Sequence, residues 1–149
     1  MFYGVCRHKL NSRNQLTIPS RFREAIDEER DGRGFYLFRD ERDPYLHLYT
    51  PAEMRRVVEA ARAGSLGRDQ DFLRIFFSRF TPVECDPQGR IVIPAEIKDA
   101  AGLAQEVVVV GASRRIEIWS APEWDAYEAA RKRAYEEKLG HVAEGIFGL

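Results

Sequence analysis

The sequence predicts an α+β fold in which one structural unit is used twice. The stretch Asn11–Arg23 recurs as Asp86–Lys98, at an offset of 75 residues and without a gap. Each copy contains a polar turn, three strand-type residues, a proline and a short helix. Apolar runs and helix starts then recur in the same order in both halves. A repeat of this kind determines the fold, because both copies must form the same local structure.

The first half contains strands, a tight turn and two helices. Asn14 is expected to adopt left-handed backbone in the turn, as Gly89 does in the second copy. Pro19 cannot donate to a sheet ladder, so the preceding strand ends there. In chain order, the elements are a strand over 2–10, a turn at 11–15, the return strand of this hairpin at 16–18, a helix from Ser20 to about Asp27, a charged loop over 28–34, strands at 35–38 and 46–49 and a helix over 51–62.

The second half repeats this order with different loop lengths. Thr50–Glu53 and Ser120–Glu123 are both capping boxes, with a hydroxyl at the N-cap and a glutamate three residues later. The elements are a strand over 79–85, the turn 86–90, a short strand at 91–93, a helix from Ala95 that ends at Gly102, strands at 107–110 and 116–119 and a last helix from about Pro122 to Leu139, which stops at Gly140.

A linker and an apolar helix separate the two halves. Gly64–Arg68 is the linker candidate, and Asp69–Arg79 is predicted to be a helix with apolar residues almost all round. Such a helix is buried, so it is expected to form either a wedge between the halves or a subunit contact. The predicted organisation is therefore a first repeat at 1–63, the linker and apolar helix at 64–79, and a second repeat with a C-terminal helix and tail at 80–149.

Composition limits the class of protein. The chain has 149 residues, of which 44% are hydrophobic, so it is globular rather than disordered. Each half alone is marginal for an independent core, and we expect the halves to pack together or interleave. No apolar run approaches the roughly 18–20 residues of a membrane span, and the N-terminus lacks a signal peptide pattern. A cytoplasmic location without membrane contact is the resulting expectation.

Catalytic and metal-binding patterns are not apparent in the sequence. The histidines, His8, His47 and His141, are far apart, and no Cys/His cluster has metal-ligand spacing. Cys6 and Cys85 are expected to be buried thiols rather than a disulfide. No glycine-rich phosphate loop follows a strand. We therefore expect no enzyme activity, no catalytic residues, no metal, no cofactor and no small-molecule substrate.

The charge distribution distinguishes the two copies. Residues 1–23 carry five basic side chains and no Asp or Glu, whereas residues 81–98 carry two basic and three acidic side chains. The copies thus have the same predicted shape but charges of +5 and −1, in a chain whose net charge is −1. A local basic stretch of this kind is typical of a surface that contacts phosphate.

Asp86-Pro87-Gln88-Gly89-Arg90, followed by an apolar strand, a proline and a short helix, resembles the AbrB-type swapped-hairpin DNA-binding domains. Two such copies in a chain of this length resemble the MraZ family of bacterial transcription regulators, over nearly the whole chain to about Leu139. The resemblance implies a duplicated swapped-hairpin β-barrel core with peripheral helices, a ring-shaped homo-oligomer and a nucleoid-associated regulator. It also implies binding of double-stranded DNA at promoter repeats of division and cell-wall genes.

The first turn departs from the family pattern. Asn11, Asn14 and Gln15 replace the Asp, Gly and Arg of the motif, and Arg13 retains a basic side chain. In the family the first turn is the part that meets DNA. We therefore expect groove reading by Arg13, Asn14 and Gln15, with phosphate contacts from the remaining basic residues of the stretch, Arg7, Lys9, Arg21 and Arg23. Gln15 can read an adenine edge bidentately.

Two alternatives remain open. The motif's Asp and Arg can pair to brace the turn, in which case the first copy has lost only that brace. For Asp86, Gly89 and Arg90 in the second copy, this architectural role is the favoured interpretation. The rival function is an oligomeric scaffold or protein-interaction module that has lost DNA binding. Under either function, the apolar helix near Phe76 and Phe77 and three apolar tail residues, Ile146, Phe147 and Leu149, are expected to form an interface between subunits.

Overall fold

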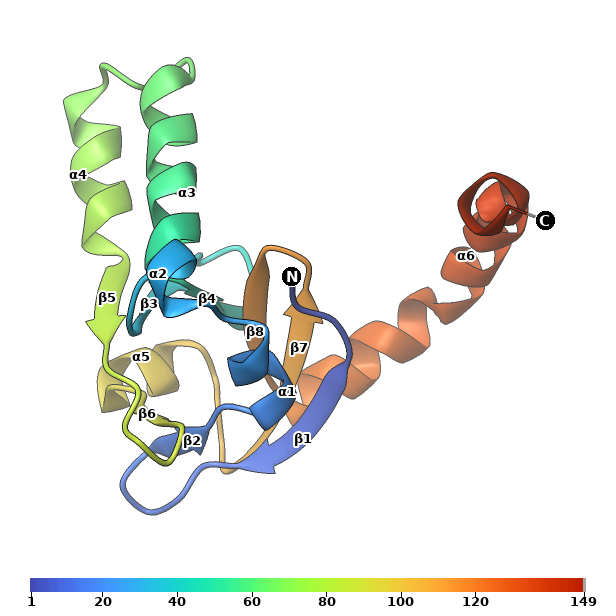
Figure 1. Ribbon diagram of the computed structural model, residues 1–149, viewed down its shortest axis with the longest axis horizontal. Helices are drawn as coiled ribbons and strands as arrows, with labels where there is room; N and C mark the ends of the chain where they lie inside the picture. The colour runs from blue at the N-terminus through green and yellow to red at the C-terminus, as the bar shows by residue number, and fades with distance from the viewer. Residues whose placement is uncertain (149) are drawn as a thin grey trace.

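The computed structural model describes residues 1–148; Leu149, predicted to belong to an apolar tail, lies outside the described residues. It has the α+β composition that the sequence predicts (Figure 1). The strands are β1 (Val5–Lys9), β2 (Gln15–Thr17), β3 (Phe35–Arg39), β4 (Tyr45–Tyr49), β5 (Phe80–Val83), β6 (Arg90–Val92), β7 (Glu106–Ala112) and β8 (Arg115–Ser120). The helices are α1 (Ser20–Glu24), α2 (Glu28–Asp31), α3 (Pro51–Ala63), α4 (Gln70–Ser78), α5 (Ala95–Ala100) and α6 (Ala121–Phe147).

The larger sheet interleaves strands from both halves of the chain. Its order is β1-β7-β8-β4-β3-β5, and every neighbouring pair is antiparallel. Cys6 on β1 lies opposite Val109 on β7, and Leu46 on β4 lies opposite Ile118 on β8. Neither half could form this sheet alone, because β1 is held by β7 and β4 by β8.

The smaller sheet pairs the two copies of the repeat with each other. Leu16 on β2 lies opposite Ile91 on β6. The ladder continues at both ends, since Ile18 N donates to Gly89 O at 2.8 Å and Ile93 N donates to Asn14 O at 2.9 Å. The prediction that the strand at 16–18 returns along the strand at 2–10 is therefore wrong. Strand β2 pairs with β6 instead. This pairing places four apolar side chains in the core, where none is accessible to solvent: Leu16, Ile18, Ile91 and Ile93.

Two apolar clusters form the interior. The larger lies between the smaller sheet and one face of the larger sheet, and includes Phe22, Leu37 and Ile116. The smaller lies on the opposite face, where Trp119 and Val108 pack against Trp124 at the start of α6. The central strands β7 and β8 are thus buried on both faces, which explains their nearly continuous apolar sequence.

Local signals in the sequence predicted the helix starts correctly. Thr50 Oγ1 accepts from Glu53 N, and Ser120 Oγ accepts from Glu123 N, each at 3.3 Å. The helix expected over 20–27 is shorter, however, and the charged loop contains α2. The Asp27 side chain accepts from Glu29 N at 3.0 Å and Asp27 N donates to the Asp31 side chain at 2.9 Å. These reciprocal caps form a short separate helix.

Two helical predictions are corrected by the structure. Helix α4 is not buried within this chain: none of its residues is fully buried, and Ile75 is 54% exposed. It packs beside α3 in a two-helix projection rather than as a wedge between the halves (Figure 1). Helix α6 does not stop at Gly140 but continues to Phe147, with Gly148 in left-handed backbone as its cap. A glycine within a helix costs about 1 kcal/mol, and α6 continues through both Gly140 and Gly145.

None of the helices within residues 1–148 combines the length and the apolar character needed to cross a membrane.

Candidate nucleic-acid interface

The two copies of the turn have the same backbone. Asn14 N donates to Asn11 O at 3.0 Å, and Gly89 N donates to Asp86 O at 2.9 Å. Asn14 has φ 58° and Gly89 has φ 82°, so both occupy the left-handed region. The prediction that Asn14 substitutes for the glycine is confirmed, because asparagine is among the few residues that tolerate this conformation.

The first residue of each turn organises it in the same way. Asn11 Oδ1 accepts from Arg13 N and Gln15 N, each at 2.9 Å. Asp86 Oδ1 accepts from Gln88 N and Arg90 N, also at 2.9 Å. These are Asx-type turns, in which a short side chain replaces a backbone acceptor.

The brace across each turn is present in both copies. Arg90 Nε donates to Asp86 Oδ2 at 2.8 Å, and the Asn11 amide donates to Gln15 Oε1 at 2.7 Å. The Asp–Arg ion pair is thus absent from the first copy, as the architectural alternative supposes, but a neutral amide pair takes its place. Hydrogen bonds from the Arg90 backbone, followed by its guanidinium, lower the pKa of Asp86. The first turn holds the same shape without a carboxylate.

The brace also fixes which atoms of Gln15 are available. Asn11 Oδ1 already accepts two backbone N–H groups, so its NH2 group must face Gln15 and donate. Gln15 therefore turns its carbonyl oxygen inward. Its NH2 group, which only donates, is the part left for a ligand.

The two turns of the repeat, and the basic residues near them, lie at different ends of the β2–β6 ladder. Because β2 and β6 are antiparallel, Gln15 lies beside Val92 while Thr17 lies beside Arg90, so the two turns lie at opposite ends of the ladder. The first turn carries Arg13, which is exposed, and follows Lys9 at the exposed end of β1. This end therefore collects Lys9, Arg13, Asn14 and Gln15.

The other three predicted phosphate contacts, Arg7, Arg21 and Arg23, have polar partners within the chain. Arg7 forms an ion pair with Asp125 of α6, which raises the pKa of the guanidinium by side-chain hydrogen bonding. Arg21 donates to Val5 O at 2.7 Å and contacts Cys6 Sγ at 2.8 Å. Arg23 donates to Ile18 O at 3.0 Å and lies against Gly89 of the second turn. These arginines hold β1, α6 and the second turn in place.

Lys98, a half-buried residue of α5, was not among the residues singled out in the sequence. Helix α5 follows β6, whose neighbour Ile93 donates to Asn14 O, so α5 starts at the end of the ladder where the first turn lies. Lys98 is the repeat partner of Arg23, at the same offset of 75 residues. The symmetry of the repeat could have predicted it: α1 lies by the second turn, and α5 lies by the first.

A further polar cluster lies at the β3–β4 turn. Ligand atoms of Asp40, Asp43 and His47 lie within 4.8 Å of one another, a grouping that sequence spacing did not indicate. Arg42 donates to both oxygens of Asp40, at 2.9 and 2.6 Å, and lowers the pKa of that carboxyl to about 2. His47 Nε2 bonds Asp43 at 3.0 Å, and its Nδ1 bonds Tyr49 at 2.9 Å. Each of the three side chains therefore has a hydrogen-bond partner within the chain, and these bonds stabilise the β3–β4 turn.

Comparison with known proteins gives consistent matches. Residues 76–140 match the family model described as "MraZ protein, putative antitoxin-like". The chain is 33% identical to the transcriptional regulator MraZ of Micrococcus luteus, over 99% of this chain and 100% of that protein. It is 35% identical to the protein of the same name from Desulforamulus reducens, over 100% and 99% of the two chains. A third, from Heliobacterium modesticaldum, is 34% identical over 92% and 93%.

Proposed function

The chain belongs to the MraZ family, and from that premise we propose that it is a DNA-binding transcriptional regulator that meets DNA through its first turn. One observation carries this proposal. The first turn keeps the backbone and the brace of the second but has no carboxylate, and Arg13 is exposed at its tip. A surface that approaches phosphates gains from the absence of a negative charge.

The contacts are divided between affinity and sequence choice. Lys9 and Lys98 lie at the end of the ladder where the first turn lies and supply phosphate contacts, which position the protein but carry no sequence information. Arg13 and the outward NH2 group of Gln15 are the groove readers. Both are donors, so they favour acceptor atoms such as guanine O6 and N7 over the donor–acceptor pair of adenine. Arg7, Arg21 and Arg23 contribute to DNA binding mainly by holding the scaffold.

The remaining parts of the proposal concern the fold and the assembly. The reciprocal pairing of β2 with β6 supports a duplicated AbrB-like swapped-hairpin core, in which each copy of the turn is completed by the other. A homo-oligomeric ring would present several first turns to repeated DNA sites, and weak single contacts would add by multivalency. Promoter repeats of division and cell-wall genes are the proposed targets, and the nucleoid is the proposed location. No enzymatic activity is proposed.

The decisive test of this function is the salt dependence of binding to the protein's own promoter DNA. A DNA binder loses affinity steeply as salt rises, because binding releases counterions from the phosphates. The same titration with an Arg13→Ala variant assigns the contact to the first turn. An unaltered affinity in that variant would remove the turn from the interface.

A scaffold that does not bind DNA is the second candidate, and the exposed apolar surfaces favour it. Ile75 on α4 and Ile146 and Phe147 on α6 are each more than half exposed, at 54%, 62% and 62%. Surfaces of this kind mark protein interfaces. Absence of DNA binding at low salt, in a protein that still forms oligomers, would favour this second function.

A further inference from the structure

Helix α6 carries an apolar stripe along the part that projects from the body of the molecule. Near its start, Trp124 and Tyr127 pack on Trp119, with ring centroids 5.2 and 4.8 Å apart. Further along, apolar residues recur at spacings of four, three and four, so they lie on one side of the helix. They are Tyr135, Leu139, Val142 and Ile146.

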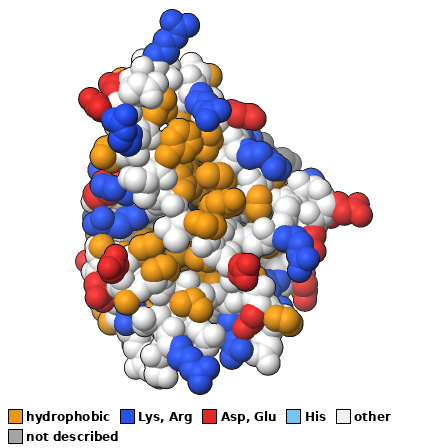
Figure 2. Space-filling model, turned by 90° about the vertical axis from the view of Figure 1, so that its left-hand side faces the viewer, with side chains coloured by type: hydrophobic (Ala, Val, Ile, Leu, Met, Phe, Trp, Pro, Cys, Tyr) orange, Lys and Arg blue, Asp and Glu red, His pale blue; other side chains and the backbone are white. Residues whose placement is uncertain are grey.

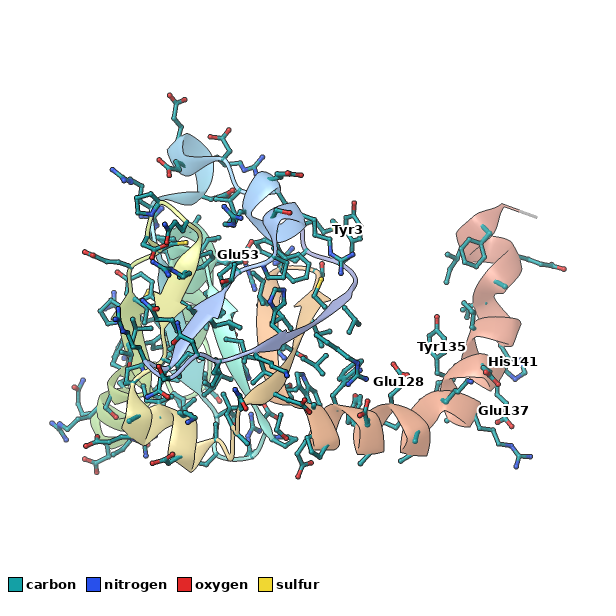
Figure 3. The ribbon with its side chains drawn as sticks, turned by 90° about the horizontal axis from the view of Figure 1, so that it is seen from below. Tyr3, Glu53, Glu128, Tyr135, Glu137 and His141 are labelled. Atoms are coloured by element: carbon teal, nitrogen blue, oxygen red, sulfur yellow. The ribbon has the colours of Figure 1, made fainter. Side chains whose placement is uncertain are left out.

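Three of the four side chains in the stripe are exposed in the single chain. Tyr135 is 62% exposed, Val142 is 49% exposed and Ile146 is 62% exposed. In Figure 3 the helix projects away from the body, with Tyr135 on the side that faces the body and Glu137 on the other side. Most helical stability in proteins comes from packing an amphipathic face against a partner. This part of α6 therefore requires a surface that the chain itself does not supply.

A second unpartnered apolar face lies on the α3–α4 hairpin. No residue of α3 or α4 is fully buried, although both helices have apolar faces. Phe38, Phe72, Ile75 and Phe76 line a groove of about 380 Å3 between α4 and the β3–β4 turn. Figure 2 shows hydrophobic side chains gathered along the side of the molecule that carries α4 and β5.

The two faces cannot meet within one chain. Helix α4 leads directly into β5 at one edge of the larger sheet, whereas Asp125 of α6 pairs with Arg7 on β1 at the other edge. Five strand spacings of about 4.8 Å separate these edges, roughly 24 Å in all. Figure 1 shows α4 and the end of α6 on opposite sides of the body.

The two segments that carry these faces have opposite net charges. Residues 51–79, which form the hairpin, contain six arginines and four carboxylates, a net charge of +2. Residues 135–148 of the tail contain one lysine and three glutamates, a net charge of −2 with His141 neutral. Two tails or two hairpins would repel each other, whereas a tail and a hairpin attract.

We infer that the α6 tail of one copy docks on the α3–α4 hairpin of a second copy. The stripe from Tyr135 to Ile146 covers the apolar groove at Ile75. This contact joins different surfaces of the two copies, so it is head-to-tail and repeats from copy to copy until a ring closes. The inference rests on the proposal that the protein acts as a homo-oligomer, but it is independent of DNA binding.

Two substitution variants and their mixture test this contact. The tail variant carries Val142→Glu and Ile146→Glu, and the hairpin variant carries Ile75→Glu, which adds a negative charge opposite the negative tail. All three positions are about half exposed or more, so the body of the chain keeps its core. Ala130→Glu on α6 and Ala60→Glu on α3, both at exposed positions away from these faces, are the matched controls.

Light scattering without DNA gives the readout. Each interface variant alone is expected to fall to the monomer mass of 17.2 kDa, while the controls keep the mass of the unaltered oligomer. The mixture should form a dimer of twice the monomer mass and no larger species, because only one intact tail and one intact hairpin remain per pair. Circular dichroism checks that each variant is folded.

Three results would overturn the head-to-tail contact. A tail variant that still associates would indicate hairpin–hairpin pairing, and a hairpin variant that still associates would indicate tail–tail pairing. An unaltered protein that is monomeric would remove the oligomer itself. Failure of DNA binding in an intact oligomer would instead count against the proposed function and leave this interface standing.

Discussion

The Asn11 side-chain amide donates to Gln15 Oε1 at 2.7 Å, in the position where Asp86 accepts from Arg90 Nε at 2.8 Å. The two turns thus keep one geometry with two chemistries, a neutral amide pair and an ion pair. The neutral version leaves the first turn without a carboxylate. That difference, rather than a difference of shape, separates the proposed DNA-reading turn from its repeat.

The amide pair predicts that substitutions of its two members, Asn11 and Gln15, lower the stability by different amounts. Gln15→Arg would place guanidinium donors against the Asn11 NH2 group, which cannot turn over because Asn11 Oδ1 accepts two backbone N–H groups. The free energy of unfolding should fall by about 0.5–1 kcal/mol, the net value of one hydrogen bond. Asn11→Asp alone should cost less, because the Gln15 amide can turn over and donate.

The double variant, Asn11→Asp with Gln15→Arg, should recover the stability that Gln15→Arg alone removes. Urea denaturation of the four proteins gives the coupling energy. Additive effects of the two substitutions would show that the side chains do not brace the turn.

The exposed arginine and the braced arginine should differ in what they affect. Arg13→Ala should leave thermal stability unchanged but weaken DNA binding and reduce the discrimination between the promoter sequence and unrelated DNA, because Arg13 is assigned to base edges. Arg90→Ala removes the partner of Asp86, so it should lower the melting temperature more than the affinity. Fluorescence anisotropy and thermal denaturation of both variants separate these effects. A larger drop in affinity for Arg90→Ala would assign DNA reading to the second turn.

Backbone conformation in the second turn gives a third prediction. An alanine at Gly89 would have φ 82° and a Cβ atom 2.5 Å from Arg23 Nε, which donates to Ile18 O. We expect the free energy of unfolding to fall by about 1–2 kcal/mol because of the left-handed conformation and by about 1 kcal/mol more because of the displaced hydrogen bond. Gly102→Ala is the matched control, because its φ is 70° and its Cβ would meet nothing within 4 Å.

Asn14→Gly should change stability by less than about 0.5 kcal/mol, because glycine adopts the same conformation freely. Chemical denaturation measures all three variants. Equal destabilisation by Gly89→Ala and Gly102→Ala would show that Arg23 does not support the second turn.

His47 predicts how stability depends on pH. Burial lowers the pKa of His47 below its usual value of 6.5, against a smaller opposing effect of the Asp43 hydrogen bond. The unfolded chain therefore binds this proton more readily than the folded chain, so the contribution of His47 is complete above pH 6.5 and is lost as the pH falls below it. His47→Gln should flatten this part of the stability profile between about pH 5 and 7. An unchanged slope would assign the pH dependence to other groups.

Much of the fold follows from local sequence, but strand pairing does not. The caps at Thr50 and Ser120 and the left-handed Asn14 were predictable because each depends on a few adjacent residues. The partner of β2 was not, since an apolar strand can pair with either β1 or β6 and only the complete core decides between them. The extension of α6 beyond Gly140 was missed for a related reason: a glycine permits a helix end but does not require one.

In the candidate interface, too, features that depend on adjacent residues were predictable and features that depend on distant residues were not. The sequence identified Arg13, Asn14 and Gln15 as one turn, and the structure keeps them together. It could not show that Arg7, Arg21 and Arg23 are held by Asp125, Val5 and Ile18, because these interactions join distant segments. The position of Lys98 could have been predicted only from the symmetry of the repeat.

A titration of the protein's own promoter DNA over a range of salt concentrations tests the central claim most directly. The unaltered protein should bind at low salt, and the logarithm of its affinity should fall linearly with the logarithm of the salt concentration. Arg13→Ala should bind more weakly and should distinguish this DNA less well from an unrelated sequence. A folded oligomer that does not bind this DNA at low salt would contradict the account of the first turn as a DNA reader.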